Sequence, residues 1–158
     1  MIRPIEGWIA IAIVMIVAFA VLASCEPAHA VQEGQSIVVE TIMMEAANQG
    51  EEGMVAVAEV IRNRAKRDNR SMMEVVLKPK QFSCWNSKKW AVEWLERYGD
   101  GQSYQKASKA LEIALGGSRT VSGATLYHSN AVQPSWAKSR LCHEVAIIGN
   151  HVFYTEAR

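Results

Sequence analysis

The chain has 158 residues, of which 49% are hydrophobic and 21% charged, and this composition excludes an intrinsically disordered protein. Its formal net charge of +1 excludes a dedicated nucleic-acid-binding domain, since such domains are strongly basic. The length is that of one ordinary domain with a tail. We therefore predict an export segment over residues 1–30 and one folded domain over residues 31–158.

The export segment contains a charge-free apolar span, Trp8–Ser24, which predicts an N-terminal hydrophobic helix at the lower length limit for crossing a bilayer. The sequence after this span allows three alternatives: lipidation at Cys25 after a lipobox-like sequence, cleavage at Ala28–His29–Ala30, or retention of the span as a membrane anchor. All three place the rest of the chain in the cell envelope, either in the periplasm or anchored to the inner membrane. A core helix is the remaining alternative, and it would need burial on every side.

Two helices are predicted at the start of the folded domain. Ser36–Ala47 has apolar residues at helical spacing and is followed by the stop signal Asn48–Gln49–Gly50. A second helix begins at Glu51 with the clearest amphipathic pattern in the chain and ends in a basic cluster. A capping box, Ser71–Glu74, then opens a short helix that stops before proline.

The second half of the domain changes from helix to strand. Helices are predicted over Lys88–Tyr98, with Trp90 and Trp94 on one face that we expect to pack in the core, and over Ser103–Leu115. A β-hairpin follows, because the apolar stretches 145–148 and 151–154 flank a Gly-Asn turn. The fold class is therefore α+β, mainly helical with a small antiparallel sheet near the C-terminus.

Cys84 and Cys142 are the two cysteines of the folded domain. In an exported protein an even pair predicts a disulfide, and two separate buried thiols are the alternative. No serine-hydrolase elbow, phosphate-binding loop or zinc-ligand spacing is present, so we expect no metal and no cofactor. A Cys–His peptidase remains an alternative, which the disulfide would remove.

Glu45 is the carboxylate of greatest interest. It lies in the last turn of a predicted helix, among Met43, Met44, Ala46 and Ala47. Apolar surroundings and the negative end of a helix both disfavour the charged form. A carboxyl group that holds its proton near neutral pH can act as a general acid on a glycosidic oxygen.

Ordered motifs around this residue resemble the SleB-like cell wall hydrolases, the spore cortex-lytic enzymes. The matching blocks are Glu45-Ala46, Gly53–Ala58, Asn63-Arg64, Pro79–Asn86, Tyr127–Ser129, Pro134–Ala137 and Ile148–Tyr154. The resemblance implies a lysozyme-like fold, cleavage of peptidoglycan glycan strands by residues 31–158, and Glu45 as the catalytic residue. The Lys-Gln-Phe-Ser-Cys-Trp-Asn variant resembles bacteriophage and Gram-negative members, so a phage-encoded endolysin is one expected origin.

The sequence departs from the family at one point, because Asn48 and Gln49 replace a Gly-Glu pair that many members carry. A single glutamate then fits the chemistry of a lytic transglycosylase, with hydrolysis by an activated water as the other outcome. The loss of this acid also leaves a non-catalytic, peptidoglycan-binding envelope protein as the alternative function.

The matched blocks supply the expected substrate contacts, with aromatic rings for sugar faces and polar groups for hydroxyl and N-acetyl groups. The expected partner is the peptidoglycan glycan strand, with no nucleic acid. His151, beside the hairpin turn, is expected to be structural. The expected contacts are Gln81, Phe82, Trp85, Asn86, Tyr127, Ser129, Asn130, Trp136 and Tyr154.

Overall fold

A computed structural model describes the backbone over residues 28–157 and the side chains over residues 36–157. The apolar span Trp8–Ser24 and Cys25 lie outside these residues, so cleavage, lipidation and anchoring stay predictions. Among the described residues, no helix combines the length and the apolar character needed to cross a membrane. Residues from Gly34 onward form one compact unit of helices followed by a small sheet.

All the helices predicted for residues 36–115 are present in the structure, whereas the predicted N-terminal hydrophobic helix lies outside the described residues. The chain changes direction between the first two helices at Gly50, whose φ of 73° lies in the region that favours glycine. The predicted capping box is also confirmed, since the Ser71 and Glu74 side chains each bind the other's backbone N–H. The helical elements are α2 (Ala28–Ala46), η1 (Ala47–Gln49), α3 (Gly50–Asp68), α4 (Met72–Leu77), η2 (Ser83–Trp85), α5 (Lys88–Tyr98), α6 (Gly101–Leu115) and η3 (Ser135–Lys138).

The sheet has three antiparallel strands in the order β1-β3-β2. These are β1 (Leu126–Ser129), β2 (Cys142–Ile148) and β3 (His151–Glu156). The predicted hairpin is confirmed as β2 and β3, which are joined at Gly149 and Asn150, and the weakly alternating segment before it is the edge strand β1. The prediction of a mainly helical domain with a small C-terminal sheet is therefore confirmed.

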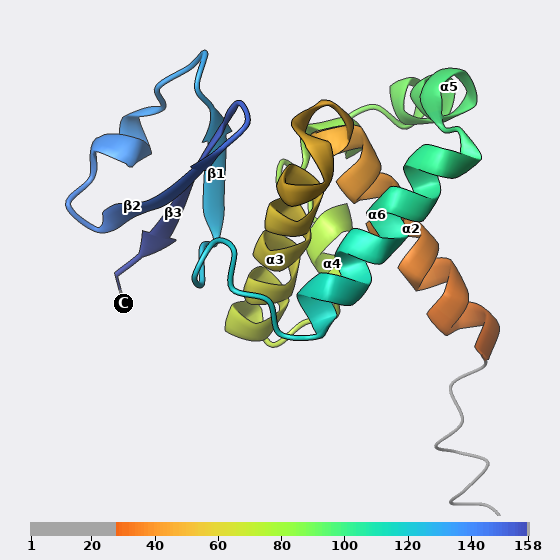
Figure 1. The fold of residues 1–158 in the computed structure, drawn as a ribbon, viewed down its shortest axis with the longest axis horizontal. Coiled ribbons are helices and arrows are strands. Elements are labelled where there is room, and N and C mark those ends of the chain that lie inside the picture. The colour runs from red at the N-terminus through yellow and green to blue at the C-terminus, as the bar shows by residue number, and fades with distance from the viewer. Residues whose placement is uncertain (1–27, 158) are drawn as a thin grey trace, which may run out of the picture. The chain divides into compact units, whose positions relative to one another are not determined.

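Helix α3 lies between the other helices and the sheet (Figure 1). Its residues Val57 and Ile61 belong to a core shared with α2, α4 and α6. Its residues Ala56 and Val60 belong to a second core, which includes Phe153 of β3. Burial on two sides explains why Gly53–Ile61 is buried throughout, although the sequence shows one amphipathic face.

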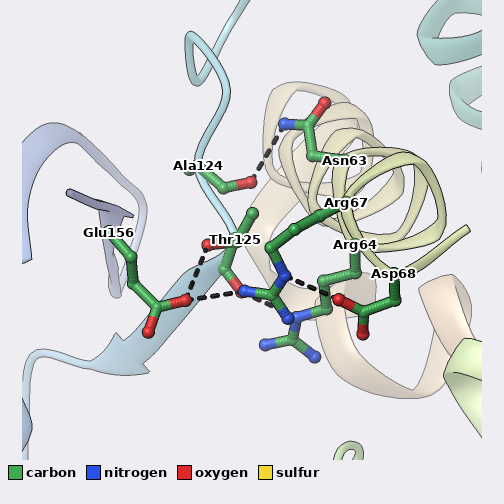
Figure 2. A network of polar contacts seen from close by, with 7 residues as sticks. All are labelled: Asn63, Arg64, Arg67, Asp68, Ala124, Thr125 and Glu156. Carbon is green, nitrogen blue, oxygen red and sulfur yellow. Dashed lines mark hydrogen bonds and ion pairs between the residues drawn. The ribbon is translucent and has the colours of Figure 1, made fainter. Parts of the chain in front are cut away.

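Polar side chains near the end of α3 fasten the sheet to this helix (Figure 2). Arg64 Nε donates to the Thr125 carbonyl at 2.7 Å, one residue before β1 begins. Arg67 Nη1 lies 2.6 Å from the Glu156 carboxylate at the end of β3. Asn63 adds a bond to the carbonyl that precedes Thr125. These contacts fix the strand that carries Tyr127.

Candidate active site

Glu45 is half-buried in the last turn of α2, where two other segments reach its carboxyl group. The Tyr127 hydroxyl of β1 donates a hydrogen bond to Glu45 Oε2 at 2.9 Å. From η2, Ser83 Oγ and the Cys84 amide each lie 3.4 Å from Glu45 Oε1. Donors therefore hold the carboxyl group from both sides while part of it faces solvent.

The η2 segment is held against α2 by Trp85. Its indole Nε1 donates to Thr41 Oγ1 at 2.8 Å, and the Thr41 hydroxyl donates in turn to the Ile37 carbonyl at 2.7 Å. Thr41 precedes Glu45 by one helical turn, so this bond places η2 beside the carboxyl group. The half-buried Trp85 ring retains some exposure for the substrate contact that the sequence predicts.

Phe82 is 1% exposed, so the prediction that it contacts substrate is wrong. The ring is part of the helical core, and the Arg64 guanidinium lies 5.0 Å from its centroid. A large apolar side chain at this position gains more by full burial than by lining an open cleft. Burial lowers the pKa of Arg64, and the nearby Tyr127 and Glu45 oppose that shift.

Tyr127 is itself surrounded by aromatic rings, with its centroid 5.0 Å from that of His151 and 5.6 Å from that of Phe153. Burial raises the pKa of Tyr127 well above its usual range, and the Glu45 carboxylate raises it further. Tyr127 therefore remains a neutral donor toward Glu45. Burial lowers the pKa of His151 despite the opposing effect of Glu45, so the ring is neutral near physiological pH.

Trp136 and Tyr154 lie on the other face of the sheet. Side chains alternate along β1, so Tyr127 and His128 point to opposite faces. The His128 and Tyr154 rings stack with centroids 5.4 Å apart, and Trp136 meets Tyr154 edge-on at 5.4 Å. The structure thus does not bring these two predicted sugar-binding residues together with Glu45.

The four predicted polar contacts are placed at the ends of the segments that reach Glu45. Ser129 shares the sheet face of Tyr127, and the exposed Asn130 follows at the end of β1. Gln81 is half-buried before η2, and Asn86 is exposed directly after it. A substrate contact for each of these residues stays a prediction.

Gln49, one of the two residues at which the sequence departs from the motifs it resembles, contacts the hairpin turn. Its Oε1 accepts the Asn150 backbone N–H at 2.6 Å. Gly149 has a φ of 56°, and a Cβ atom there would collide with the same Gln49 oxygen. The backbone conformation therefore favours glycine in this turn, and the end of the Gln49 side chain would have to move to admit another residue.

The predicted disulfide is not formed, because Cys84 and Cys142 are both free. Cys84 is buried in the helical core beside Glu45, whereas Cys142 opens β2 in the sheet opposite Glu156. Burial raises the pKa of Cys84 far above its usual range, and Glu45 raises it further. A thiol held in this protonated state is a poor nucleophile, which weighs against a Cys84 peptidase.

Three contributions to the site went unrecognised in the sequence: Thr41, the Ser83 hydroxyl and the Cys84 amide. The Ser83-Cys84 pair lies inside a matched motif, but only the docking of η2 on α2 reveals these contacts. Over residues 28–157, no three His, Cys, Asp or Glu side chains gather closely enough to hold a metal ion.

Residues 48–154 match the family described as Cell Wall Hydrolase. The chain belongs to this family. This cell wall hydrolase resembles the catalytic domain of the Bacillus cereus SleB protein, with 26% identity, a TM-score of 0.59 and coverage of 78% of this chain and 91% of that one.

A second solved structure has the same fold as this cell wall hydrolase. It is the catalytic domain of the germination-specific lytic transglycosylase SleB from Bacillus anthracis, with 24% identity, a TM-score of 0.58 and coverage of 78% of this chain and 95% of that one. No curated protein matches the chain. The family resemblance read from the sequence motifs is confirmed, and Glu45 lies just before the matched range.

Proposed function

We propose that the chain cleaves peptidoglycan glycan strands between N-acetylmuramic acid and N-acetylglucosamine, with Glu45 as its single catalytic acid. The observation that carries the proposal is the Glu45 carboxyl group, half-buried and bound by the Tyr127 hydroxyl at 2.9 Å. Family membership and the resemblance to SleB catalytic domains support peptidoglycan as the substrate.

In the first step, protonated Glu45 gives its proton to the bridging oxygen as the bond from that oxygen to the anomeric carbon breaks. The resulting carboxylate accepts hydrogen bonds from Tyr127, Ser83 and the Cys84 amide. These donors stabilise the negative charge that Glu45 gains as its proton leaves.

In the second step, the C6 hydroxyl of the same muramic acid attacks the anomeric carbon, and its proton returns to Glu45. The product is a 1,6-anhydro sugar, and the acid is regenerated without a water molecule. Two arrangements support this outcome over hydrolysis. Gln49 is an amide occupied by the hairpin turn, and Glu51 and Glu52 are exposed at the start of α3.

The test is Glu45→Gln, which keeps the shape of the side chain and removes the acid. Clearing of purified sacculi should fall roughly 10²- to 10⁴-fold. Glu40→Gln, at a half-buried position five residues earlier on α2, is the matched control and should leave clearing unchanged. Retained activity in Glu45→Gln would remove this residue from the mechanism.

Mass spectrometry of the released products tests the type of reaction. Anhydro ends support transglycosylation, reducing ends would show hydrolysis, and cut peptides would overturn cleavage of glycan strands. Binding to sacculi without any released fragment would support the non-catalytic alternative. An envelope substrate also requires export, which we assign to residues 1–30, whether they are cleaved, lipidated or retained as an anchor.

A further inference from the structure

A groove of about 800 Å³ lies directly beside the candidate active site. One wall is formed by Met44, Ala47 and Asn48, which lie within three residues of Glu45 in the chain. The opposite wall is formed by α5 and the start of α6. In Figure 1, α5 lies on the side of the helical part that is farther from the sheet. The α5 wall of the groove therefore lies away from β1, the strand that carries Tyr127.

The α5 wall carries a stripe of aromatic side chains. Trp90, Trp94 and Tyr98 are spaced four residues apart, so they share one face of α5, and all three line the groove. Trp90 is 45% exposed and Tyr98 is 54% exposed, which corrects the expectation that Trp90 packs in the core. Clustered exposed aromatic rings of this kind mark binding surfaces.

The charged residues that line the groove indicate which class of ligand it can bind. The lining includes two carboxylates, those of Glu93 and Asp100, and one guanidinium, that of Arg97. This balance disfavours a nucleic acid, which has a charged phosphate on every nucleotide, more than a glycan strand with one lactyl carboxylate per disaccharide. Flat rings that alternate with hydrogen-bonding groups suit a saccharide, whose rings have apolar faces and polar edges.

We propose that this groove binds the sugar units of the glycan strand that extend past the scissile bond, with Trp90 and Tyr98 as stacking platforms. The inference rests on the proposed function, because it assumes that the strand crosses Glu45. The groove volume of about 800 Å³ lies in the range of about 300–1,000 Å³ that ligand sites occupy. The Trp94 ring packs against the Tyr98 ring, with the two centroids 5.4 Å apart.

The experiment measures binding without cleavage, using the full-length chain with Glu45→Gln as the parent. The probe is peptide-free glycan of alternating N-acetylglucosamine and N-acetylmuramic acid, titrated by calorimetry. Adding Trp90→Ala or Tyr98→Ala should raise the Kd roughly tenfold. Trp90→Phe keeps a flat ring and should stay within about threefold of the parent. Tyr104→Ala, an exposed tyrosine of α6 outside the groove lining, is the matched control.

Unchanged Kd values for Trp90→Ala and Tyr98→Ala, with circular dichroism showing intact folds, would overturn the proposal. An equal loss of affinity in Tyr104→Ala would also overturn it, since the effect would then not belong to the groove. A failure of the proposed function would be seen in a different experiment, because the Glu45→Gln single variant would then still clear sacculi.

Discussion

The hydrogen bond between Tyr127 and Glu45 joins two residues 82 positions apart in the chain. The phenol is a suitable partner because its raised pKa keeps it neutral near physiological pH. A neutral donor favours the carboxylate without adding a charge that would repel the cationic character developing on the sugar. We therefore expect Tyr127 to act as a positioning residue for Glu45.

Tyr127→Phe should lower kcat roughly 10- to 100-fold, because a hydrogen bond to a charged group is worth about 1.5–3 kcal/mol. KM should stay close to its original value, since the phenol acts on Glu45 and the variant retains the ring. Measured rates on soluble glycan strands check both parameters, with Tyr104→Phe as the control. A change in KM alone would instead make Tyr127 a substrate-binding residue.

Glu59 is the buried carboxylate that links α3 to the segment leading into the sheet. It is fully buried and accepts bonds from Ser118 Oγ at 2.5 Å, Thr120 N at 2.8 Å and Val121 N at 3.0 Å. Burial raises the pKa of Glu59, but these bonds outweigh it, so the pKa lies below its usual 4.5. The charged form therefore stabilises the fold.

Glu59→Gln should lower the free energy of unfolding by roughly 2–4 kcal/mol near neutral pH, because the new amide group faces buried donors. The folded-state pKa is depressed, so the stabilisation is complete above 4.5 and is lost as pH falls through the folded value. The difference between the two proteins should thus narrow on acidification.

Urea unfolding at neutral pH and below about pH 4 measures this difference. Glu112→Gln, on the exposed face of α6, should change stability by less than about 0.5 kcal/mol at either pH. A difference for Glu59→Gln that grows on acidification would contradict the assigned role of the charge.

The helices and the hairpin could be predicted from the sequence because their signals are local. The capping box at Ser71 and the Gly-Asn turn act within a few residues, so no distant contact is needed to read them. The fate of aromatic residues could not be predicted, because burial depends on which element packs against each face. Phe82 lies in the core and Trp90 lines a groove, the reverse of what their surroundings in sequence indicate.

Glu45 was found in the sequence because its helix end and its motif are both local features. Its hydrogen bonds could not be predicted, because Tyr127, expected only as a substrate contact, reaches it through the docking of β1 and Ser83 through the docking of η2. The dependence on how distant elements dock also explains why the predicted disulfide was wrong. An even pair of cysteines is a compositional signal, and it carries no information on where the two elements lie.

At the scale of the whole domain, the site depends on how the sheet sits against the helices. Glu45 comes from the helical part and Tyr127 from the sheet, and the second core joins the two parts because it includes Ala56 and Val60 of α3 with Phe153 of β3. Polar contacts across α3 fix one end of the sheet through Arg64 and Arg67. Gln49 holds the opposite end, at the hairpin turn.

Gln49 also offers a direct test of single-acid chemistry. In Gln49→Glu a carboxylate oxygen can accept the Asn150 N–H as the amide oxygen does, so stability should change by less than about 0.5 kcal/mol. The restored acid would be held by the turn, so the products should keep anhydro ends. Gln49→Ala, which loses the bond, should destabilise by about 0.5–1.5 kcal/mol.

Unfolding curves and product mass spectra of both variants check these outcomes together. Gln49→Ala should also lower kcat, because a sheet freed at the turn no longer presents Tyr127 to Glu45 at a fixed distance. A switch to reducing ends in Gln49→Glu would mean that an acid at this position can activate water. The amide at residue 49, and not the geometry around Glu45, would then decide between transglycosylation and hydrolysis.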